Sequence, residues 1–329
     1  MTALDRVAEA VVTGAGVVTP LAGRTPEDPW FDYRARLGPR GYKYLPDACQ
    51  YLLAAAREAL VRAGEDGLGV DPAEEGGIAE ERRAAAVGTN SAVAALHADI
   101  TEVVREGGVN RLSPMTTPFF SVNLVASRLS TEYRLKGFNM TLTSPRVAGV
   151  EALHLASREL AAGRVDLVLA GATEAADPGR GPAEPEAGAV VLTLRPPDTA
   201  VPEGGAVLRT TLGFVPPAAL LGEAGRRRGN REVREILDAL TGTGGPGPDR
   251  IRLVVDGSPV AASVEAAVRD WSAGRVPVAV EVGGDRAGAL APLERLADGL
   301  LGDPSAPQVV VTAAREGNVA FASMSAPRP

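Results

Sequence analysis

The feature that most constrains this chain is an alternation of short apolar runs and amphipathic segments that occurs twice. The run VDLVLAGATE is followed by a polar break and EAGAVVLTL, and PQVVVTAAREGNVAFASM repeats that arrangement near the C-terminus with a shorter break. Apolar runs of this length predict buried strands, and helices between strands predict a mostly parallel sheet covered on both faces. The repetition predicts an α/β protein of two similar halves, residues 1–213 and 214–329, joined within the Pro-, Gly- and Arg-rich stretch 196–230.

Hydrophobic spacing, with glycine and proline as breaks, predicts the individual elements. The predicted helices are Leu45–Ala63, Ala92–Arg105, Phe119–Tyr133, Val147–Ala162, Arg231–Leu240, Ser263–Trp271 and Leu290–Leu301. The predicted strands are Ala10–Val18, Ala84–Val87, Asn139–Thr143, Val165–Ala170, Ala189–Leu194, Arg252–Val255, Val276–Val282, Gln308–Thr312 and Ala320–Met324. The basic run Gly225–Arg231 (GRRRGNR) is predicted to be a solvated loop, with contact to an acidic carrier protein as the alternative.

Composition excludes several classes of function. The 329 residues include 34 basic and 41 acidic ones, and a net charge of −7 argues against sequence-independent nucleic-acid binding. No stretch approaches the ~18 apolar residues of a membrane span, and the first residues lack a signal-peptide pattern, so we expect a cytoplasmic protein. One cysteine and two histidines argue against a disulfide and a metal centre, and we expect no cofactor.

Few side chains are candidates for chemistry. The run VTGAGVVTP lacks the third glycine of a dinucleotide-binding fingerprint, and no helical pattern follows it, so its glycines predict a tight strand exit. Cys49 lies on the apolar face of a predicted helix, which favours a small buried residue over a nucleophile. His97 and His154 lie within predicted helices and are interpreted as packed or surface residues rather than general bases.

The central part of the chain resembles the β-ketoacyl synthases of the thiolase fold. The matching features are a Ser-Pro turn, Asn123, the tripeptide Leu135-Lys136-Gly137, a strand–turn–helix segment and the strand end Ala-Gly-Ala-Thr-Glu. AVVTGAGVVTPLA and YLPDACQYLLAAAREAL are similar to the family's first strand and first long helix, so the resemblance extends over nearly the whole chain. It implies a thiolase-like α/β fold with duplicated halves and α-β-α-β-α layers.

The resemblance also implies which positions carry the family's chemistry, and each holds a different residue here. Counting back from Gly163, which matches the glycine that ends the nucleophile helix, the cysteine of active members falls on Arg146. Their two histidines fall on Asp256 and Asp285, and the lysine that precedes the second histidine falls on Val280. Arginine cannot form a thioester or accept a proton, and ionised aspartates would repel a developing enolate. The resemblance therefore implies a chain with no intact catalytic residue.

The charged replacements predict an ion cluster. In the family's geometry positions 146, 256 and 285 converge, so one arginine and two aspartates would fill the former acyl pocket. Such partners would also compensate a cation placed at a helix N-terminus. Replacing Arg146 alone would then leave buried charge unpaired, at a cost of about 3–5 kcal/mol.

Family members work as dimers, so the resemblance implies a partner subunit. In type II polyketide systems an active ketosynthase pairs with a homologous chain length factor that lacks the cysteine, and the pair acts with an acyl carrier protein. This chain resembles such a non-catalytic subunit, although that class usually has glutamine where Arg146 stands. The predicted dimer interface lies within residues 119–143 and includes Phe119, Phe120, Asn123, Asn139, Thr141 and Thr143.

Two alternatives remain open at this point. One is an enzyme of altered chemistry, in which Arg146 holds a carboxylate or phosphate and Asp256 or Asp285 acts as the base. The other is a homodimeric scaffold without catalysis. Neither nucleic acid nor a membrane is expected as a partner.

Overall fold

The computed structural model describes residues 7–20, 30–65, 68, 77–114, 117–180, 186–242, 247–273, 276–282 and 288–326. The strands in these ranges are β1 (Ala8–Val18), β2 (Arg83–Gly88), β3 (Asn139–Leu142), β4 (Leu167–Glu174), β5 (Gly188–Arg195), β6 (Ala206–Phe214), β7 (Arg250–Val255), β8 (Val278–Val282), β9 (Gln308–Ala313) and β10 (Asn318–Ser325). The helices are α1 (Tyr33–Arg36), α2 (Asp47–Ala63), α3 (Ala94–Gly107), α4 (Leu124–Tyr133), α5 (Ala148–Ala161), α6 (Glu223–Thr241), α7 (Pro259–Ser272) and α8 (Ala291–Gly302). Two 3-10 helices also matter below, η4 (Thr117–Phe120) and η6 (Pro217–Leu221).

The described strands form one sheet in the order β3-β2-β4-β5-β1-β6-β10-β9-β7-β8. The first five make an N-terminal wing and the last five a C-terminal wing, and the second wing repeats the first in mirror order with β6 in the place of β1. The predicted duplication of an α/β unit is therefore present. The prediction of a mostly parallel sheet is wrong, because five of the nine strand pairs are antiparallel. Strands β5 and β10 return antiparallel to β4 and β9 instead of crossing over through a helix.

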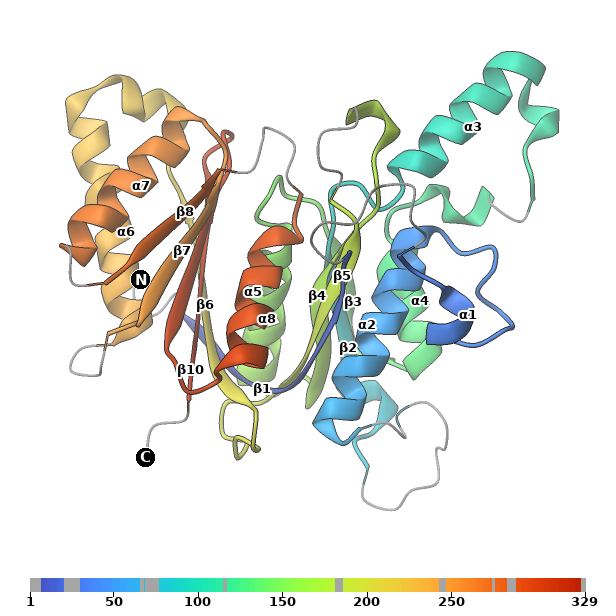
Figure 1. The fold of residues 1–329 in the computed structure, drawn as a ribbon, viewed down its shortest axis with the longest axis horizontal. Coiled ribbons are helices and arrows are strands. Elements are labelled where there is room, and N and C mark those ends of the chain that lie inside the picture. The colour runs from blue at the N-terminus through green and yellow to red at the C-terminus, as the bar shows by residue number, and fades with distance from the viewer. Residues whose placement is uncertain are drawn as a thin grey trace.

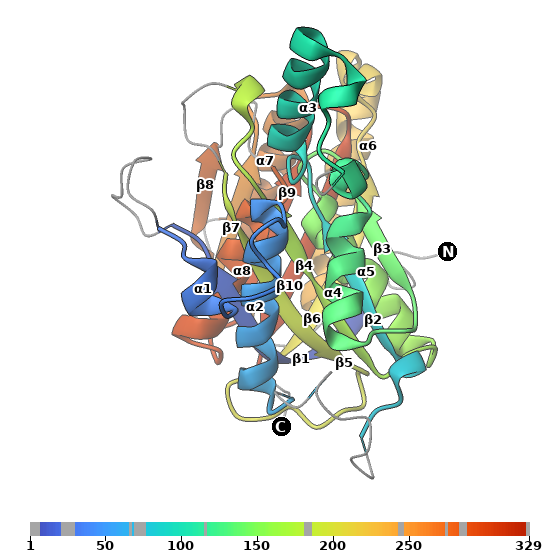
Figure 2. The same cartoon turned by 90° about the vertical axis from the view of Figure 1, so that its right-hand side faces the viewer.

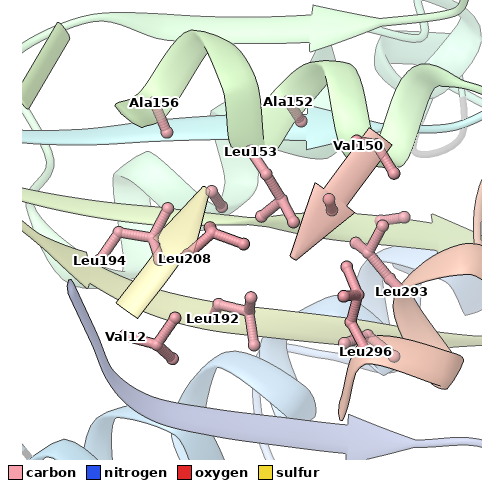
Figure 3. Close-up of a cluster of buried hydrophobic side chains, with 14 of the residues drawn as sticks. Val12, Val150, Ala152, Leu153, Ala156, Leu192, Leu194, Leu208, Leu293 and Leu296 are labelled. Carbon is pink, nitrogen blue, oxygen red and sulfur yellow. The ribbon is translucent and has the colours of Figure 1, made fainter. Parts of the chain in front are cut away.

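The two wings enclose α5 and α8, as Figure 1 shows. Helices α6 and α7 cover the outside of the C-terminal wing, and α2 and α4 cover the outside of the N-terminal wing, where Figure 2 shows them side by side. The resulting order of layers is α-β-α-β-α, as the resemblance implies. Three buried clusters fill the spaces between layers, and in the central one Val12, Leu153, Leu192, Leu208 and Leu293 converge from both wings and both central helices (Figure 3).

Small residues let α5 approach the N-terminal wing closely. A Cβ at Gly88, the last residue of β2, would lie 2.3 Å from the carbonyl carbon of Ala148 at the start of α5. A Cβ at Gly149 would lie 2.5 Å from the carbonyl oxygen of Ala289, which precedes α8. Real side chains do not tolerate such distances, so both glycines are required for this packing. The start of α5 is thereby fixed between β2 and the segment that leads into α8.

Three predicted elements differ from the structure. The basic run Gly225–Arg231 is part of α6 and not a loop, because arginine is a good helix former and the following apolar residues Val233, Ile236 and Leu237 are buried against the C-terminal wing. The predicted helix Phe119–Tyr133 is divided into η4 and α4. Strand β6 lies in the stretch that was expected to be an irregular joint. Across the described part of the chain, no helix combines the length and the apolar character that crossing a membrane requires.

Candidate functional site

The turn between β3 and α5 places Arg146 at the position where the resemblance expects a nucleophile. Arg146 has a φ of +62° and is only 4% exposed. Its backbone N–H donates to Oδ1 of Asn90 at 3.1 Å, and Nδ2 of Asn90 donates to the carbonyl oxygen of Thr143, also at 3.1 Å. A left-handed conformation costs an L residue about 1–2 kcal/mol, so the surrounding structure holds this turn in place. The tight turn is thus present, but it carries a guanidinium group.

Asp256 lies at the end of β7 and is buried. Its Oδ1 accepts the N–H of Ser258 at 3.0 Å, and its Oδ2 accepts the N–H of Arg315 at 3.0 Å. Oγ of Ser258 in turn accepts the N–H of Ala261 and caps α7. The carboxylate therefore ties the β7–α7 turn to the β9–β10 turn.

The expected ion pair between Arg146 and Asp256 does not form, although the structure describes both residues. Asp256 instead accepts the backbone amides of the two turns beside it. Asp285 lies outside the described residues, so its part in an ion cluster stays a hypothesis. Val280 lies on β8 beside Leu253 of β7 and packs on the outer core of the C-terminal wing. It places an apolar side chain where the resemblance expects a lysine.

Sequence reasoning missed a buried glutamate at the end of β4. Glu174 is fully buried and accepts the N–H groups of Asn90, Ser91 and Ala289 at 2.8, 2.6 and 2.8 Å. The hydroxyl groups of Thr89 and Ser91 donate to it as well. One carboxylate thus joins the β2–α3 turn, β4 and the entrance to α8. The signal in the sequence was the glutamate that ends the otherwise apolar strand AGATE.

A second glutamate, Glu186, binds the backbone of the same segment before α8. Glu186 accepts the N–H groups of Gly288 and Ala291, the latter at 2.6 Å. Burial, and then the charge of Glu174, raise the pKa of Glu186 to about 8. A Cβ at Gly288 would lie 2.4 Å from an oxygen of each glutamate, so only glycine fits between them. The two carboxylates hold the first turn of α8 beside the Arg146 turn.

The remaining candidates lie away from Arg146. Cys49 is buried in the outer core of the N-terminal wing, where burial raises the pKa of its thiol to about 12 and makes it unreactive. His154 lies in α5 with Nδ1 3.2 Å from Oγ1 of Thr210, and burial lowers its pKa to about 4. Nε2 of His97, on α3, lies 2.7 Å from the carbonyl oxygen of Phe120. Cys49 and His154 are thus buried in the packed interior, and His97 is half-buried on α3. Within the described ranges, no group of histidine, cysteine, aspartate and glutamate side chains could hold a metal ion.

Three of the residues predicted for the dimer interface, Asn139, Thr141 and Thr143, lie on or just after the edge strand β3. Strand β3 ends the sheet order, with Asn139 and Thr143 exposed and Thr141 half-buried. The N–H groups of Ala85 and Thr89 donate to the carbonyl oxygens of Phe138 and Leu142, so the even-numbered residues of this strand face β2. The backbone groups of residues 139 and 141 therefore face away from the sheet. Among the other predicted residues, Phe120 is 57% exposed, Asn123 is exposed and Phe119 is half-buried.

Comparisons with known proteins agree with this architecture. Residues 32–183 match the family model "Beta-ketoacyl synthase, N-terminal domain". The 3-oxoacyl-[acyl-carrier-protein] synthase 2 of Rhizobium meliloti (strain 1021) is 34% identical over 76 residues, which span 23% of this chain and only 18% of that protein.

Two solved structures share the fold along nearly the whole chain. One is AntDE:AntF, a type II PKS acyl-carrier protein in complex with its ketosynthase, with a TM-score of 0.70, 17% identity, and coverage of 97% of this chain and 99% of that chain. The other is the ishigamide ketosynthase/chain length factor, with a TM-score of 0.67, 19% identity, and coverage of 98% and 100%. Residues 32–183 are thus similar to the N-terminal domain of β-ketoacyl synthases, and the described fold is similar to the fold of these solved ketosynthase structures.

Proposed function

We propose that the chain is a non-catalytic ketosynthase-like subunit, of the chain length factor type, that pairs with an active β-ketoacyl synthase. The observation that carries this proposal is Arg146, buried in an intact left-handed turn at the start of α5 where active members have their cysteine. The position has kept the backbone of a nucleophile turn and lost the nucleophile. This combination fits a subunit whose fold serves a partner.

The neighbouring groups also fit a chain without condensation chemistry. Condensation needs a nucleophile that carries the acyl group and hydrogen-bond donors that stabilise the enolate. Arginine stays protonated and can do neither the acyl transfer nor the proton abstraction. Asp256 accepts two backbone N–H groups and offers an enolate only acceptor oxygens. Val280 has no polar group in its side chain.

The exposed edge of β3 supports pairing with a second chain. An edge strand presents unpaired N–H and C=O groups that another strand can bond, and exposed apolar side chains nearby favour burial in an interface. Met140 on β3 is 43% exposed, and Phe120 on η4 is 57% exposed. The ishigamide ketosynthase/chain length factor and the AntDE:AntF complex with its acyl-carrier protein suggest the partners, an active ketosynthase and a carrier protein.

The enzyme of altered chemistry is less well supported. Of its two proposed bases, Asp256 accepts the amides of Ser258 and Arg315, which gives its side chain a structural role. The other, Asp285, lies outside the described residues. A homodimeric scaffold would use the same β3 edge and is separated from the main proposal by experiment.

The test is co-expression of this chain with an active type II ketosynthase, followed by size-exclusion chromatography and a condensation assay. We expect a heterodimer, condensation by the pair, and no condensation by this chain alone. A chain that forms only homodimers would favour the scaffold, and condensation by this chain alone would overturn the non-catalytic assignment. A chain that stays monomeric beside the ketosynthase would overturn the pairing.

The edge itself is tested with Thr141→Pro, which removes an outward N–H without removing a bond to β2. We expect the heterodimer to be lost while the melting temperature of the chain stays near that of the wild type. The matched control is Val278→Pro on β8, at the opposite end of the sheet, where the bond from Ile251 N–H to the carbonyl oxygen of Pro277 shows that residue 278 faces outward. This control should still pair.

A further inference from the structure

A surface cavity of about 880 Å³ lies on the C-terminal wing, where α6 and α7 end and β7 begins. Its volume is within the range of small-molecule sites, about 300–1,000 Å³. Trp271, half-buried near the end of α7, and Val276 form its apolar part. The charged side chains that line it are Arg234, Asp238, Asp249 and Asp270. Asp249 precedes β7 whereas Asp256 follows it, so this cavity is separate from the site described above.

The charges in this cavity are not balanced. Arg234 forms an ion pair with Asp270, so these two side chains neutralise each other. The carboxylate of Asp238 accepts the indole N–H of Trp271 at 2.7 Å, and the side chain of Asp249 has neither a hydrogen bond nor an ion pair with any described residue. Two exposed carboxylates therefore lack a cationic partner within the described part of the chain. The C-terminal ends of α6 and α7 add the negative ends of two helix dipoles.

A single metal ion does not fit this arrangement. Across the residues that the structure describes, no three histidine, cysteine, aspartate or glutamate side chains come close enough to hold one. Asp238 lies in the last turn of α6 and Asp249 lies just before β7, so a ligand that meets both must extend across the cavity. Anionic ligands are disfavoured, because the two carboxylates would repel them. The cavity therefore favours an organic cation with two charged groups and an apolar stretch between them.

We propose that this cavity binds a linear polyamine, with one ammonium group at Asp238, another at Asp249 and the methylene chain beside Trp271. Ammonium groups form charge-assisted hydrogen bonds with carboxylates, and methylene chains pack on apolar surface while the charged groups stay in water. An indole ring also attracts a cation. The site does not depend on the function proposed above, because it shares no residue with the Arg146 turn or with Asp256.

The experiment measures spermidine binding to the full chain by calorimetry at physiological ionic strength, with tryptophan fluorescence as a second measurement. The chain has two tryptophans, so Trp30→Phe leaves Trp271 as the only one. We expect saturable binding and a change in the Trp271 emission that follows the same binding curve. An unchanged emission, or no binding of spermidine, would overturn the proposal.

The contribution of the two carboxylates is tested with Asp238→Asn combined with Asp249→Asn. We expect this pair to weaken spermidine binding about tenfold or more, because both charge-assisted contacts are lost. The matched control is Asp99→Asn with Glu106→Gln, which removes the same formal charge from exposed positions on α3, far from α6 and α7 in Figure 1. The control should bind spermidine like the wild type. Unchanged melting temperatures show that both pairs of variants fold.

Three further outcomes would overturn the proposal. An equal loss of binding in both pairs of variants would show a general attraction of spermidine to an acidic chain. Binding of n-butylamine, which has one ammonium group, as tightly as spermidine would exclude contact with two carboxylates. Displacement of spermidine by magnesium chloride, but not by sodium chloride of the same ionic strength, would indicate a metal site instead.

Discussion

At the scale of single residues, the backbone conformation of Arg146 and the chemistry of its side chain can be considered separately. Its φ of +62° is accessible to glycine at little cost, whereas any residue with a Cβ pays for it. Asn90 bonds the backbone of the turn and not the arginine side chain, so the turn should survive substitution. The left-handed conformation is therefore set by the surrounding fold and does not depend on the guanidinium group.

The first prediction compares two substitutions that remove the same side chain. Arg146→Gly should be more stable than Arg146→Ala by about 1 kcal/mol, because only glycine relieves the left-handed backbone. Urea denaturation gives the two unfolding free energies. At the neighbouring Val147, whose φ is −90°, the order should reverse and alanine should be better than glycine. Equal stability of the two Arg146 variants would contradict the left-handed turn.

The second prediction concerns His154, which burial keeps neutral. Because its pKa falls from 6.5 to about 4 on folding, the unfolded chain binds a proton that the folded chain does not bind in that range. The free energy of unfolding should therefore fall by about 3 kcal/mol as the pH decreases from about 6.5 to about 4. His154→Gln should remove most of this loss in urea denaturation at the two pH values. Ser157→Ala, a buried substitution in the same helix without a titrating group, should keep it.

Part of the site could be predicted from the sequence. Counting from Gly163 placed Arg146 at the start of α5, where the structure has it. The partners of Asp256 could not be predicted, because backbone amides of turns compete for a carboxylate and leave no pattern in the sequence. The hydrogen bonds from the backbone of residues 288–291 to Glu174 and Glu186 could not be predicted either. The donors and acceptors are more than 100 residues apart along the chain.

At the scale of elements, strong periodicity was a reliable guide and composition was a poor one. Helix α2 begins two residues after its predicted start and ends as predicted, because its apolar spacing is regular. Strand β6 and the first half of α6 were missed, because glycine, proline and arginine in residues 196–230 suggested a loop. Both elements form because they pack on or pair with the sheet. The local sequence does not reveal these tertiary contacts, and their effect was larger than that of local composition.

The third prediction concerns the end of α7. Its C-cap residue Ala273 has a φ of +45° and a ψ of +37°, a left-handed conformation that favours glycine. Ala273→Gly should raise the free energy of unfolding by about 1 kcal/mol. The matched control is Ala162→Gly at the C-cap of α5, where φ is −78° and glycine brings only its larger entropy in the unfolded chain. Thermal denaturation of both variants should show shifts of opposite sign.

At the scale of the whole molecule, the two wings meet where β1 pairs with β6. The mirror order of strands assigns β6 to the second unit, and we propose a boundary before residue 206 as an alternative to the division expected at 213/214. The wings are further joined by α5 and α8, which share the central core. Cohesion between them therefore depends on the sheet, on apolar packing, and on Glu174 and Glu186, which bind the backbone at the start of α8.

The last prediction tests those glutamates through Glu174→Gln. The new amide nitrogen cannot accept the N–H groups that Glu174 accepts from both wings, and leaving buried donors without an acceptor costs about 1–3 kcal/mol each. We expect the variant to lose about 3 kcal/mol or more at neutral pH in urea denaturation. Glu203→Gln, an exposed control, should be neutral.

The same variant should change the pH dependence in a defined direction. The raised pKa of Glu186 means that the folded chain holds its proton more tightly, so stability falls as the pH rises from about 4.5 to about 8. Because the charge of Glu174 contributes to that shift, Glu174→Gln lowers the pKa of Glu186 and makes this fall shallower. A variant that is destabilised but retains the full slope would show that the two carboxylates act independently, each holding its own amides at the start of α8.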